Sequence, residues 1–236
     1  MRAAIIGYGK MGKEIETILL SQGHEISVIV NDSSQLINLT NGSSDVAIEF
    51  SNPESATKNI RYCLENGIPV ISGTTGWLEA KSEIDEICNQ NNGAFLYASN
   101  FSIGVNLFFQ LNKQLAALME PYQDYRAKMH EIHHTSKKDA PSGTAITLAE
   151  DIIDHHSRYA DWKHGEPLSD GSLEITHDRI AHVPGTHIIQ YQSEIDEITI
   201  QHKAHSRKGF ALGAVLAAEW IINKQGVFTM SDVLFS

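Results

Sequence analysis

Cysteine, basic residues and long apolar runs are all scarce in this sequence of 236 residues. Its two cysteines, Cys63 and Cys88, are too few for the disulfide framework of a small secreted domain or for a cysteine-based metal site. No run approaches the roughly 20 consecutive apolar residues that a membrane helix needs. The first apolar run, residues 2–6, is also too short for a signal peptide. We therefore expect a cytoplasmic protein with no membrane partner.

The shortage of basic residues argues against nucleic acid as a partner. Eighteen Lys and Arg stand against 29 Asp and Glu, which gives a net charge of −11. Non-specific nucleic-acid affinity comes from Lys and Arg on phosphate, so an acidic chain binds it poorly. The cations gather in two clusters, within residues 126–138 and 203–208. Such concentration in an acidic chain favours the binding of a small anion.

The first hundred residues alternate short apolar runs with helical patterns. Dividing the length by roughly 150 residues per domain gives between one and two domains. Strands are predicted over residues 2–6, 25–30, 45–50, 69–72 and 94–98, and helices over 11–20, 55–65 and 81–89. This alternation predicts an α/β, Rossmann-like domain, in which a parallel sheet carries helices on both faces.

The pattern changes after residue 100. Helices are predicted over 103–119 and 141–153, with Pro141 just inside the start of the second, and a strand over 125–134. A polar stretch to Asp170 precedes strand-like runs near 173–182, 187–193 and 195–202, which predict an α+β domain with a mixed or antiparallel sheet and helices on one face. The apolar helix over 209–222 is expected to pack back on the first domain.

A glycine-rich turn separates the first strand from the first helix. Gly7-Tyr8-Gly9-Lys10-Met11-Gly12 fits the pattern G-x-G-x-x-G. The glycines permit a tight turn and close approach to a pyrophosphate, which the helix N-terminus then faces. Asp32, at the end of the second strand, stands where a ribose 2′-hydroxyl would be held. The context favours dinucleotide binding over a purely structural turn.

Two further segments end strands at the same edge of the predicted sheet. Gly73-Thr74-Thr75-Gly76 follows the fourth strand, and Ala98-Ser99-Asn100-Phe101 ends the fifth. Open α/β sheets bind ligands at this edge. The alternative for the first segment is an ordinary turn, and for the second a hinge between domains, and both roles can hold together.

Residues 130–134, His-Glu-Ile-His-His, match the zinc-protease pattern H-E-x-x-H. That pattern holds an ion only on a helix, where residues four apart share a face. The flanking sequence predicts a strand, on which His130 and His134 would lie about 13 Å apart. We predict no metal.

The segment from His133 to Thr144 carries the densest chemistry. His133 and Lys137 are groups that can donate protons. Backbone amides of Gly143 and Thr144, at the start of a helix, could hold a carboxylate. A solvated basic loop before a capped helix is the alternative.

With these motifs the chain resembles the 4-hydroxy-tetrahydrodipicolinate reductase (dihydrodipicolinate reductase) family, NAD(P)H enzymes of the diaminopimelate route to lysine. The matching segments are Gly7–Gly12, Asp45–Glu54, Gly73–Gly76, Asn100–Asn106, His133–Ala145, Gly185–His187 and His202–Ala211. One departure is Thr135-Ser136, where many relatives carry a basic or amide side chain.

The resemblance implies reduction of the cyclic dicarboxylate 4-hydroxy-tetrahydrodipicolinate to tetrahydrodipicolinate. It gives His133 and Lys137 catalytic proton-transfer roles, and it assigns His134, Gly143, Thr144 and Arg207 to substrate binding. Residues 7–12, Asp32, 73–75 and 98–101 would bind the nicotinamide cofactor. Residues 1–103 and 206–236 would form the dinucleotide-binding domain, and residues 104–205 a substrate-binding domain whose sheet also builds a homotetramer.

Asp32 predicts NADH as the preferred cofactor over NADPH. Its carboxylate accepts hydrogen bonds from the ribose hydroxyls of NADH and repels a 2′-phosphate. No Lys or Arg occurs from residue 25 to 57, so Lys10 and Lys13 are the nearest cations by sequence.

Two alternative functions stay open. Another two-domain amino-acid dehydrogenase, acting on aspartate or homoserine, would not need the segment 133–144. A module that senses NAD without catalysis would lack the acid that His133 and Lys137 provide.

Overall fold

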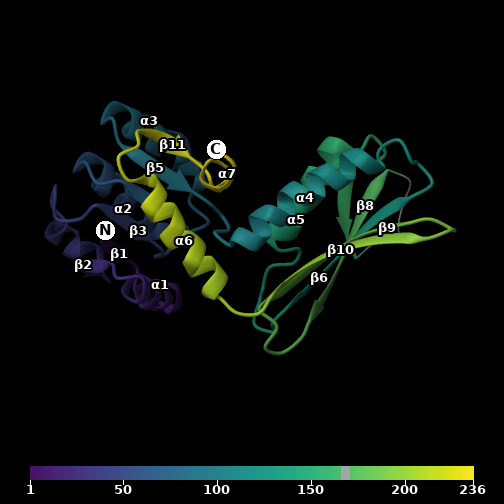
Figure 1. Ribbon diagram of the computed structural model, residues 1–236, viewed down its shortest axis with the longest axis horizontal. Coiled ribbons are helices and arrows are strands. Elements are labelled where there is room, and N and C mark those ends of the chain that lie inside the picture. The colour runs from purple at the N-terminus through teal and green to yellow at the C-terminus, as the bar shows by residue number, and fades with distance from the viewer. Residues whose placement is uncertain (166–170) are drawn as a thin grey trace. The chain divides into compact units, whose positions relative to one another are not determined.

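The computed structural model describes residues 1–165 and 171–236, which fold into two compact units (Figure 1). Unit 1 comprises Met1–Ile103 and Arg207–Ser236, and unit 2 comprises Gly104–Ser206. The last part of the polar stretch predicted up to Asp170 lies outside the described residues. Within the described ranges, no helix combines the length and the hydropathy needed to cross a membrane.

Unit 1 is built on a six-stranded sheet with the order β11-β5-β4-β3-β1-β2. All of its strand pairs are parallel. The strands are β1 (Arg2–Ile6), β2 (Glu25–Val30), β3 (Val46–Glu49), β4 (Val70–Ser72), β5 (Ala94–Tyr97) and β11 (Gly226–Phe228). Central strands such as β3 are buried on both faces, which explains the apolar run over residues 46–48.

Helices cover both faces of this sheet. Helices α1 (Lys10–Ser21) and α6 (Lys208–Ile221) share one core with the sheet, and α2 (Pro53–Glu65) and α3 (Lys81–Gln90) share the other. Short 3-10 helices η1 (Ser33–Asn38) and η2 (Leu78–Ala80) and the terminal α7 (Met230–Phe235) complete the unit. The Rossmann-like prediction is confirmed, and α6 packs on unit 1 as expected.

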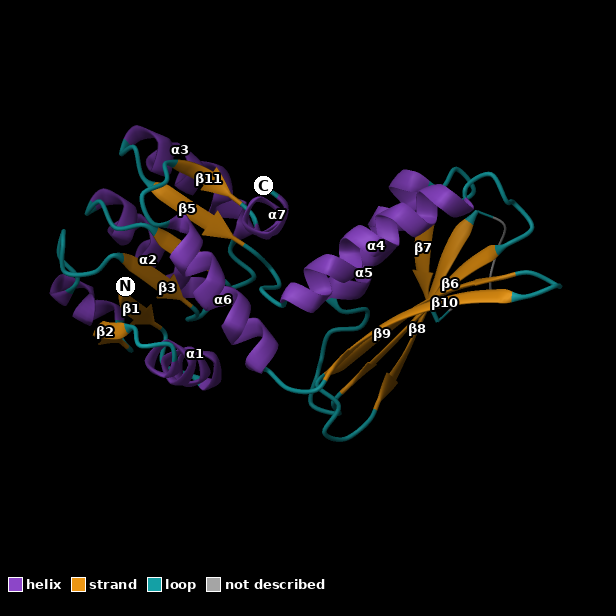
Figure 2. Cartoon of the chain, in the orientation of Figure 1, coloured by secondary structure: helices purple, strands orange, loops and turns teal. Residues whose placement is uncertain are grey.

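Unit 2 contains a five-stranded mixed sheet with the order β10-β9-β6-β8-β7. Its strands are β6 (Arg126–His133), β7 (Asp161–His164), β8 (Ser172–Arg179), β9 (Gly185–Gln192) and β10 (Glu197–Ala204). Strand β6 pairs parallel with β8 and antiparallel with β9. Helices α4 (Ile103–Met119) and α5 (Gly143–His155) lie on one face of the sheet (Figure 2). Their buried residues, such as Leu148, pack against Ile175 and Tyr191 of the sheet.

The start of α5 corrects one prediction. The helix begins at Gly143 and not at Pro141, because the Ser142 side chain caps it by accepting a hydrogen bond from the amide of Ala145 at 3.2 Å. The Ala140–Pro141 peptide bond is cis. The polar stretch before Asp170 also contains β7, a four-residue edge strand whose polar sequence gives no alternating signal.

Candidate functional site

The glycines of the β1–α1 turn in unit 1 meet different structural requirements. Gly7 has φ +93°, and a Cβ there would lie 2.1 Å from the Phe50 carbonyl oxygen. A Cβ on Gly12 would lie 2.2 Å from the Gly7 carbonyl oxygen. A Cβ on Gly9 would meet no atom within 4 Å, so packing within the chain does not require glycine there. The open space beside Gly9, at the start of α1, fits the close approach of a pyrophosphate.

The remaining residues of this turn are held by contacts within unit 1. The hydroxyl of Tyr8 donates a hydrogen bond to Glu16. Lys13 Nζ lies 5.7 Å from the centre of the Tyr8 ring, a cation–π distance. Met11 packs partly buried against the core beneath α1, and Lys10 is the first residue of the helix. The turn therefore presents backbone amides and two cations at one end of α1.

Asp32 borders a small cavity at the end of β2. The cavity has a volume of about 120 Å³, and its lining includes Gly7, Asp32, Ser51 and Asn59. Asp32 caps η1 by accepting a hydrogen bond from the Ser34 amide at 2.8 Å. Hydrogen bonds from Ser34, aided by the positive charge of Lys58, lower the pKa of Asp32. The predicted carboxylate is thus ionised beside a cavity that Gly7 also lines.

Lys58 is a neighbour of Asp32 that sequence reasoning missed. It lies on α2, 26 positions beyond Asp32, and directly follows the stretch 25–57 that lacks Lys and Arg. Its charge acts on Asp32 because the ends of β1 and β2 and the first part of α2 line the same cavity. The predicted fold could have indicated Lys58, because α2 follows β3 and therefore begins at the same edge of the sheet as Asp32.

Glu49 connects two loops of the predicted cofactor site. It ends β3 fully buried, and its carboxylate accepts hydrogen bonds from Ser72 at 2.6 Å and Thr74 at 2.9 Å. The amide and hydroxyl of Ser51 donate to the same carboxylate. Sequence reasoning did not single out Glu49, although an acid inside a buried strand is an available signal.

Phe50 lies beside several predicted cofactor residues of unit 1. A Cβ on Gly73 would lie 2.2 Å from its ring, so glycine is needed there. The Phe50 ring is 5.5 Å from the ring of Phe101, which is buried, as is Ala98. Asn100 accepts a hydrogen bond from the Ser102 amide at 2.9 Å. The structure therefore brings the segments at 7, 73 and 101 together around Phe50, the first at its backbone carbonyl and the other two at its ring.

In unit 2, strand pairing brings three ionisable side chains onto one face of the sheet. Glu131 and His133 are two positions apart on β6, so their side chains share a face, and Glu131 is paired with His187 of β9. The three side chains are almost fully buried, with exposed fractions of 1%, 8% and 5% for the respective residues. Gly185 lies close by, since a Cβ there would be 3.0 Å from His133 Cε1.

Glu131 stands at the centre of this group. Its Oε2 is 3.3 Å from His133 Nε2 and 3.8 Å from His187 Nε2, although the angle to His133 is poor for a hydrogen bond. Its Oε1 is 3.3 Å from Arg179 Nη2. The amide of Ser142 donates to both oxygens at 3.2 Å.

These contacts and the burial of the site determine the charges of Glu131 and His187. Burial opposes ionisation of Glu131, but the contacts with His133 and Ser142 prevail and lower its pKa to about 2. Burial, together with the positive charge of His133, lowers the pKa of His187 to about 3. At neutral pH Glu131 is therefore an anion and His187 is neutral.

Lys137 lies in the loop that connects β6 to α5. Lys137 Nζ forms an ion pair with Asp139 at 2.8 Å, and Arg179 donates to the Asp139 carbonyl at 2.8 Å. His134 Nδ1 is 2.8 Å from Ser136 Oγ. Gly143 and Thr144 form the first turn of α5, where the helix dipole is positive.

The two histidines of the H-E-x-x-H pattern do not converge. His130 contacts Thr176 and Asp178, whereas His134 contacts Ser136. The ligand-type atoms of Glu131, His133 and His187 do lie within 4.8 Å of one another. The Arg179 guanidinium and the Ser142 amide already bind that carboxylate, so we still expect no metal.

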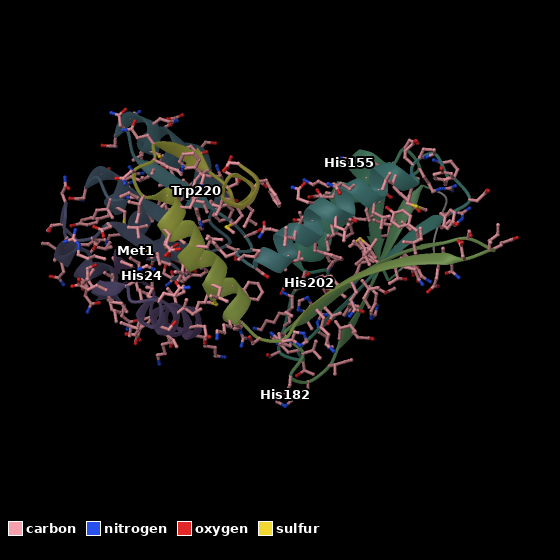
Figure 3. All side chains as sticks on the ribbon, in the orientation of Figure 1. Met1, His24, His155, His182, His202 and Trp220 are labelled. Carbon is pink, nitrogen blue, oxygen red and sulfur yellow. The ribbon has the colours of Figure 1, made fainter. Side chains whose placement is uncertain are left out.

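The second cationic cluster is divided between the units. Lys203 and His205 belong to unit 2, whereas Arg207, the N-cap of α6, belongs to unit 1. Figure 3 shows His202 on β10, just before this cluster, and His182 in the loop that follows β8. The role of Arg207 in substrate binding stays a prediction.

Two protein-family models match successive parts of this chain. A model of "Dihydrodipicolinate reductase, N-terminus" matches residues 1–101, and one of "Dihydrodipicolinate reductase, C-terminus" matches residues 104–234. The chain belongs to the dihydrodipicolinate reductase family. The predicted resemblance is confirmed.

Curated relatives agree with this family over the whole chain. A 4-hydroxy-tetrahydrodipicolinate reductase of Christiangramia forsetii is 49% identical over 234 residues, which cover 99% of this chain and 98% of that protein. The Thermosipho africanus protein of the same name is 32% identical over 236 residues, covering 99% and 98%.

Solved structures share the fold of this dihydrodipicolinate reductase family member. A dipicolinate-bound dihydrodipicolinate reductase from Paenisporosarcina sp. TG-14 matches with a TM-score of 0.76 at 21% identity, covering 100% of this chain and 99% of that one. A probable dehydrogenase from Thermotoga maritima matches with a TM-score of 0.60 at 11% identity, covering 99% and 92%.

Proposed function

We propose that this protein reduces 4-hydroxy-tetrahydrodipicolinate to tetrahydrodipicolinate with NADH or NADPH, in the diaminopimelate route of lysine biosynthesis. The observation that carries the proposal is the 49% identity, over the whole chain, to a relative with that activity in its name. The acid and anion-binding groups gathered in unit 2 supply the chemistry that such a reaction needs. An aspartate or homoserine dehydrogenase would not use the segment 133–144.

The family and the Rossmann-type unit imply a nicotinamide cofactor. The residues present fit this group, because the space beside Gly9 is open and α1 begins there. When bound, the cofactor supplies a hydride to a ring carbon of the substrate. We assign its binding to residues 7–12, Asp32, 73–75 and 98–101 of unit 1.

NADH is the cofactor that we propose as preferred. The ionised carboxylate of Asp32 favours ribose hydroxyls over a 2′-phosphate. Ser34 of η1 donates the hydrogen bond that holds this carboxylate. Lys58 partly offsets this repulsion, and Lys10 and Lys13 stand at the start of α1. We therefore expect a preference for NADH and not an exclusion of NADPH.

In unit 2, we assign proton transfer to His133 and Lys137. Both belong to the segment that leads from β6 into α5, where Gly143 and Thr144 of the first turn would receive one substrate carboxylate. His134, and Arg207 of unit 1, would help to neutralise the dicarboxylate. Asp139 would release the Lys137 ammonium, since a substrate carboxylate can take the place of that ion pair.

We further propose a cytoplasmic homotetramer. Support for the compartment comes from Cys63 and Cys88, which are buried free thiols. Support for assembly through unit 2 comes from its sheet, since α4 and α5 lie on one face (Figure 2) and polar side chains such as Lys128 and Gln192 meet on the other. Light scattering coupled to gel filtration tests the tetramer.

The test of the reaction is NADH oxidation on addition of freshly made dihydrodipicolinate synthase product. In this assay His133→Ala and Lys137→Ala should each lower kcat by roughly 10²–10⁴-fold, the usual contribution of a general acid. Their NADH dissociation constants should stay unchanged, because both side chains belong to unit 2. Near wild-type turnover at saturating substrate would remove that residue from the assignment, and oxidation of homoserine instead would replace the proposed function.

A further inference from the structure

One buried carboxylate serves two parts of the candidate site in unit 2. Glu131 lies 3.3 Å from the His133 imidazole, and it also accepts the Ser142 amide. Ser142 is the residue that caps α5. A single side chain therefore lies against the proposed acid and also binds the start of the helix to which the substrate carboxylate is assigned.

Among the charged groups around His133, Glu131 is the buried anion that faces the imidazole. Within the part of unit 2 that the structure describes, Arg179 of β8 and His187 of β9 face the same group, and Lys137 and Asp139 come from the following loop. His187 is neutral at the pH values where the reaction would run. Asp139 is paired with Lys137.

An anion at this distance acts on the charge of the imidazole. An opposite charge within about 4–6 Å typically shifts a titration by 1–3 pH units toward the charged form. Arg179 neutralises the second oxygen of the carboxylate, so the buried charge of Glu131 is compensated and stays in place. The carboxylate is thus fixed on one side by Arg179 and Ser142 and directed at His133 on the other.

We propose that Glu131 is a positioning residue for this reaction: its buried carboxylate, 3.3 Å from His133, stabilises the positive charge that the imidazole carries during proton transfer, and it anchors the start of α5 through Ser142. The proposal rests on the function proposed above, in which His133 transfers a proton. It assigns Glu131 no contact with the substrate.

The decisive variant is Glu131→Gln, which keeps the shape and the acceptor for Ser142 but removes the charge. Removing an anion disfavours the protonated imidazole, so the midpoint of the His133 Cε1–H NMR titration should move to lower pH by about one unit or more. The basic limb of the kcat–pH profile should move by the same amount. At pH 8 this corresponds to a loss in kcat of about tenfold, with recovery toward lower pH.

Two further variants separate charge from structure. Glu131→Asp keeps the charge on a shorter side chain, and it should restore most of the titration midpoint. Glu150→Gln removes the same charge from the exposed surface of α5, and it should leave both the midpoint and kcat unchanged. Circular dichroism of each variant establishes that it is folded.

A kcat that falls equally at every pH, with an unmoved NMR midpoint, would reduce Glu131 to a structural role and overturn the proposal. An unmoved midpoint with full activity would overturn it as well. The NMR titration needs no substrate, so it is separate from the test of function. A wild-type protein without reductase activity would refute the proposed function, while the NMR midpoint would still decide whether Glu131 controls the charge of His133.

Discussion

At the scale of single residues, buried ionisable groups make the stability of unit 2 depend on pH. His187 is 5% exposed, and in the folded state its pKa is about 3. In the unfolded chain a histidine binds a proton below about pH 6.5. Acidification therefore favours the unfolded state from about pH 6.5 down to the folded pKa. The folded pKa of Glu131, about 2, adds a further loss of stability below its ordinary value of 4.5.

The variant His187→Gln should remove the first part of this dependence. A group that takes up one proton on unfolding changes the free energy of unfolding by up to about 1.4 kcal/mol per pH unit. Urea denaturation at pH 7.5 and pH 5 should show a smaller difference for the variant than for the wild type. An equal pH dependence in both proteins would mean that His187 is not held neutral in the folded state.

Cofactor preference is a second residue-scale property, and it depends on Asp32 and Lys58. Asp32→Ser removes the repulsion of a 2′-phosphate and leaves the Lys58 charge uncompensated. The ratio of kcat/KM for NADH to that for NADPH should fall by roughly tenfold, equivalent to about 1.4 kcal/mol. Adding Lys58→Gln should reverse part of the gain with NADPH. A wild-type preference for NADPH would show that the cations outweigh Asp32.

At the scale of an element, the β1–α1 turn offers a matched pair of glycine variants. Gly9 has φ −81° and open space around its Cα, so Gly9→Ala should leave the thermal midpoint unchanged. The new methyl group would occupy the space assigned to the pyrophosphate, and the NADH dissociation constant should rise by roughly tenfold or more. Isothermal titration calorimetry measures it.

Gly12→Ala is the contrasting variant. Its Cβ would meet the Gly7 carbonyl oxygen at 2.2 Å, so both the thermal midpoint and NADH affinity should fall. If Gly9→Ala bound NADH as tightly as the wild type, the cofactor would not approach this turn.

The helices and strands also show which elements the sequence could predict and why it could not predict the others. Buried parallel strands such as β1 carry an apolar run, and their helices carry clear apolar stripes, so these elements were predicted closely. The three-residue β11 is too short for any periodic signal. The predicted start of α5 is wrong because proline favours the first helical position, whereas here Pro141 precedes the helix and the Ser142 side chain caps it.

The candidate site likewise contains residues that the sequence could predict and residues that it could not. Residues within one motif, such as His133 and Lys137, are visible in the sequence, as is Asp32 from its distance to the glycine-rich turn. Partners that arrive through pairing of distant strands are not. His187 reaches Glu131 because β9 pairs antiparallel with β6, and Arg179 arrives from β8. Register, which a single sequence does not specify, brings these charges together.

At the scale of the whole molecule, the proposed reaction needs both units at once. The residues assigned to the cofactor belong to unit 1, whereas His133 and Lys137 belong to unit 2. Hydride transfer requires reacting atoms about 3–3.5 Å apart. The chain passes between the units twice, near residues 103 and 206, and we expect these positions to act as hinges when ligands bind.

Small-angle scattering tests this expectation with NADH and pyridine-2,6-dicarboxylate, the dipicolinate that is bound in the Paenisporosarcina reductase structure. The two ligands together should reduce the radius of gyration, because the cofactor is assigned to unit 1, the dicarboxylate mainly to unit 2, and both must meet at the reacting atoms. Each ligand alone should have a smaller effect, since it engages only part of the residues assigned to the complete site. Gly9→Ala, which should weaken NADH binding, serves as the matched control, and it should need more NADH for the same change. An unchanged radius with both ligands at saturation would mean that the ligands meet without domain closure, and the hinge assignment would then be wrong.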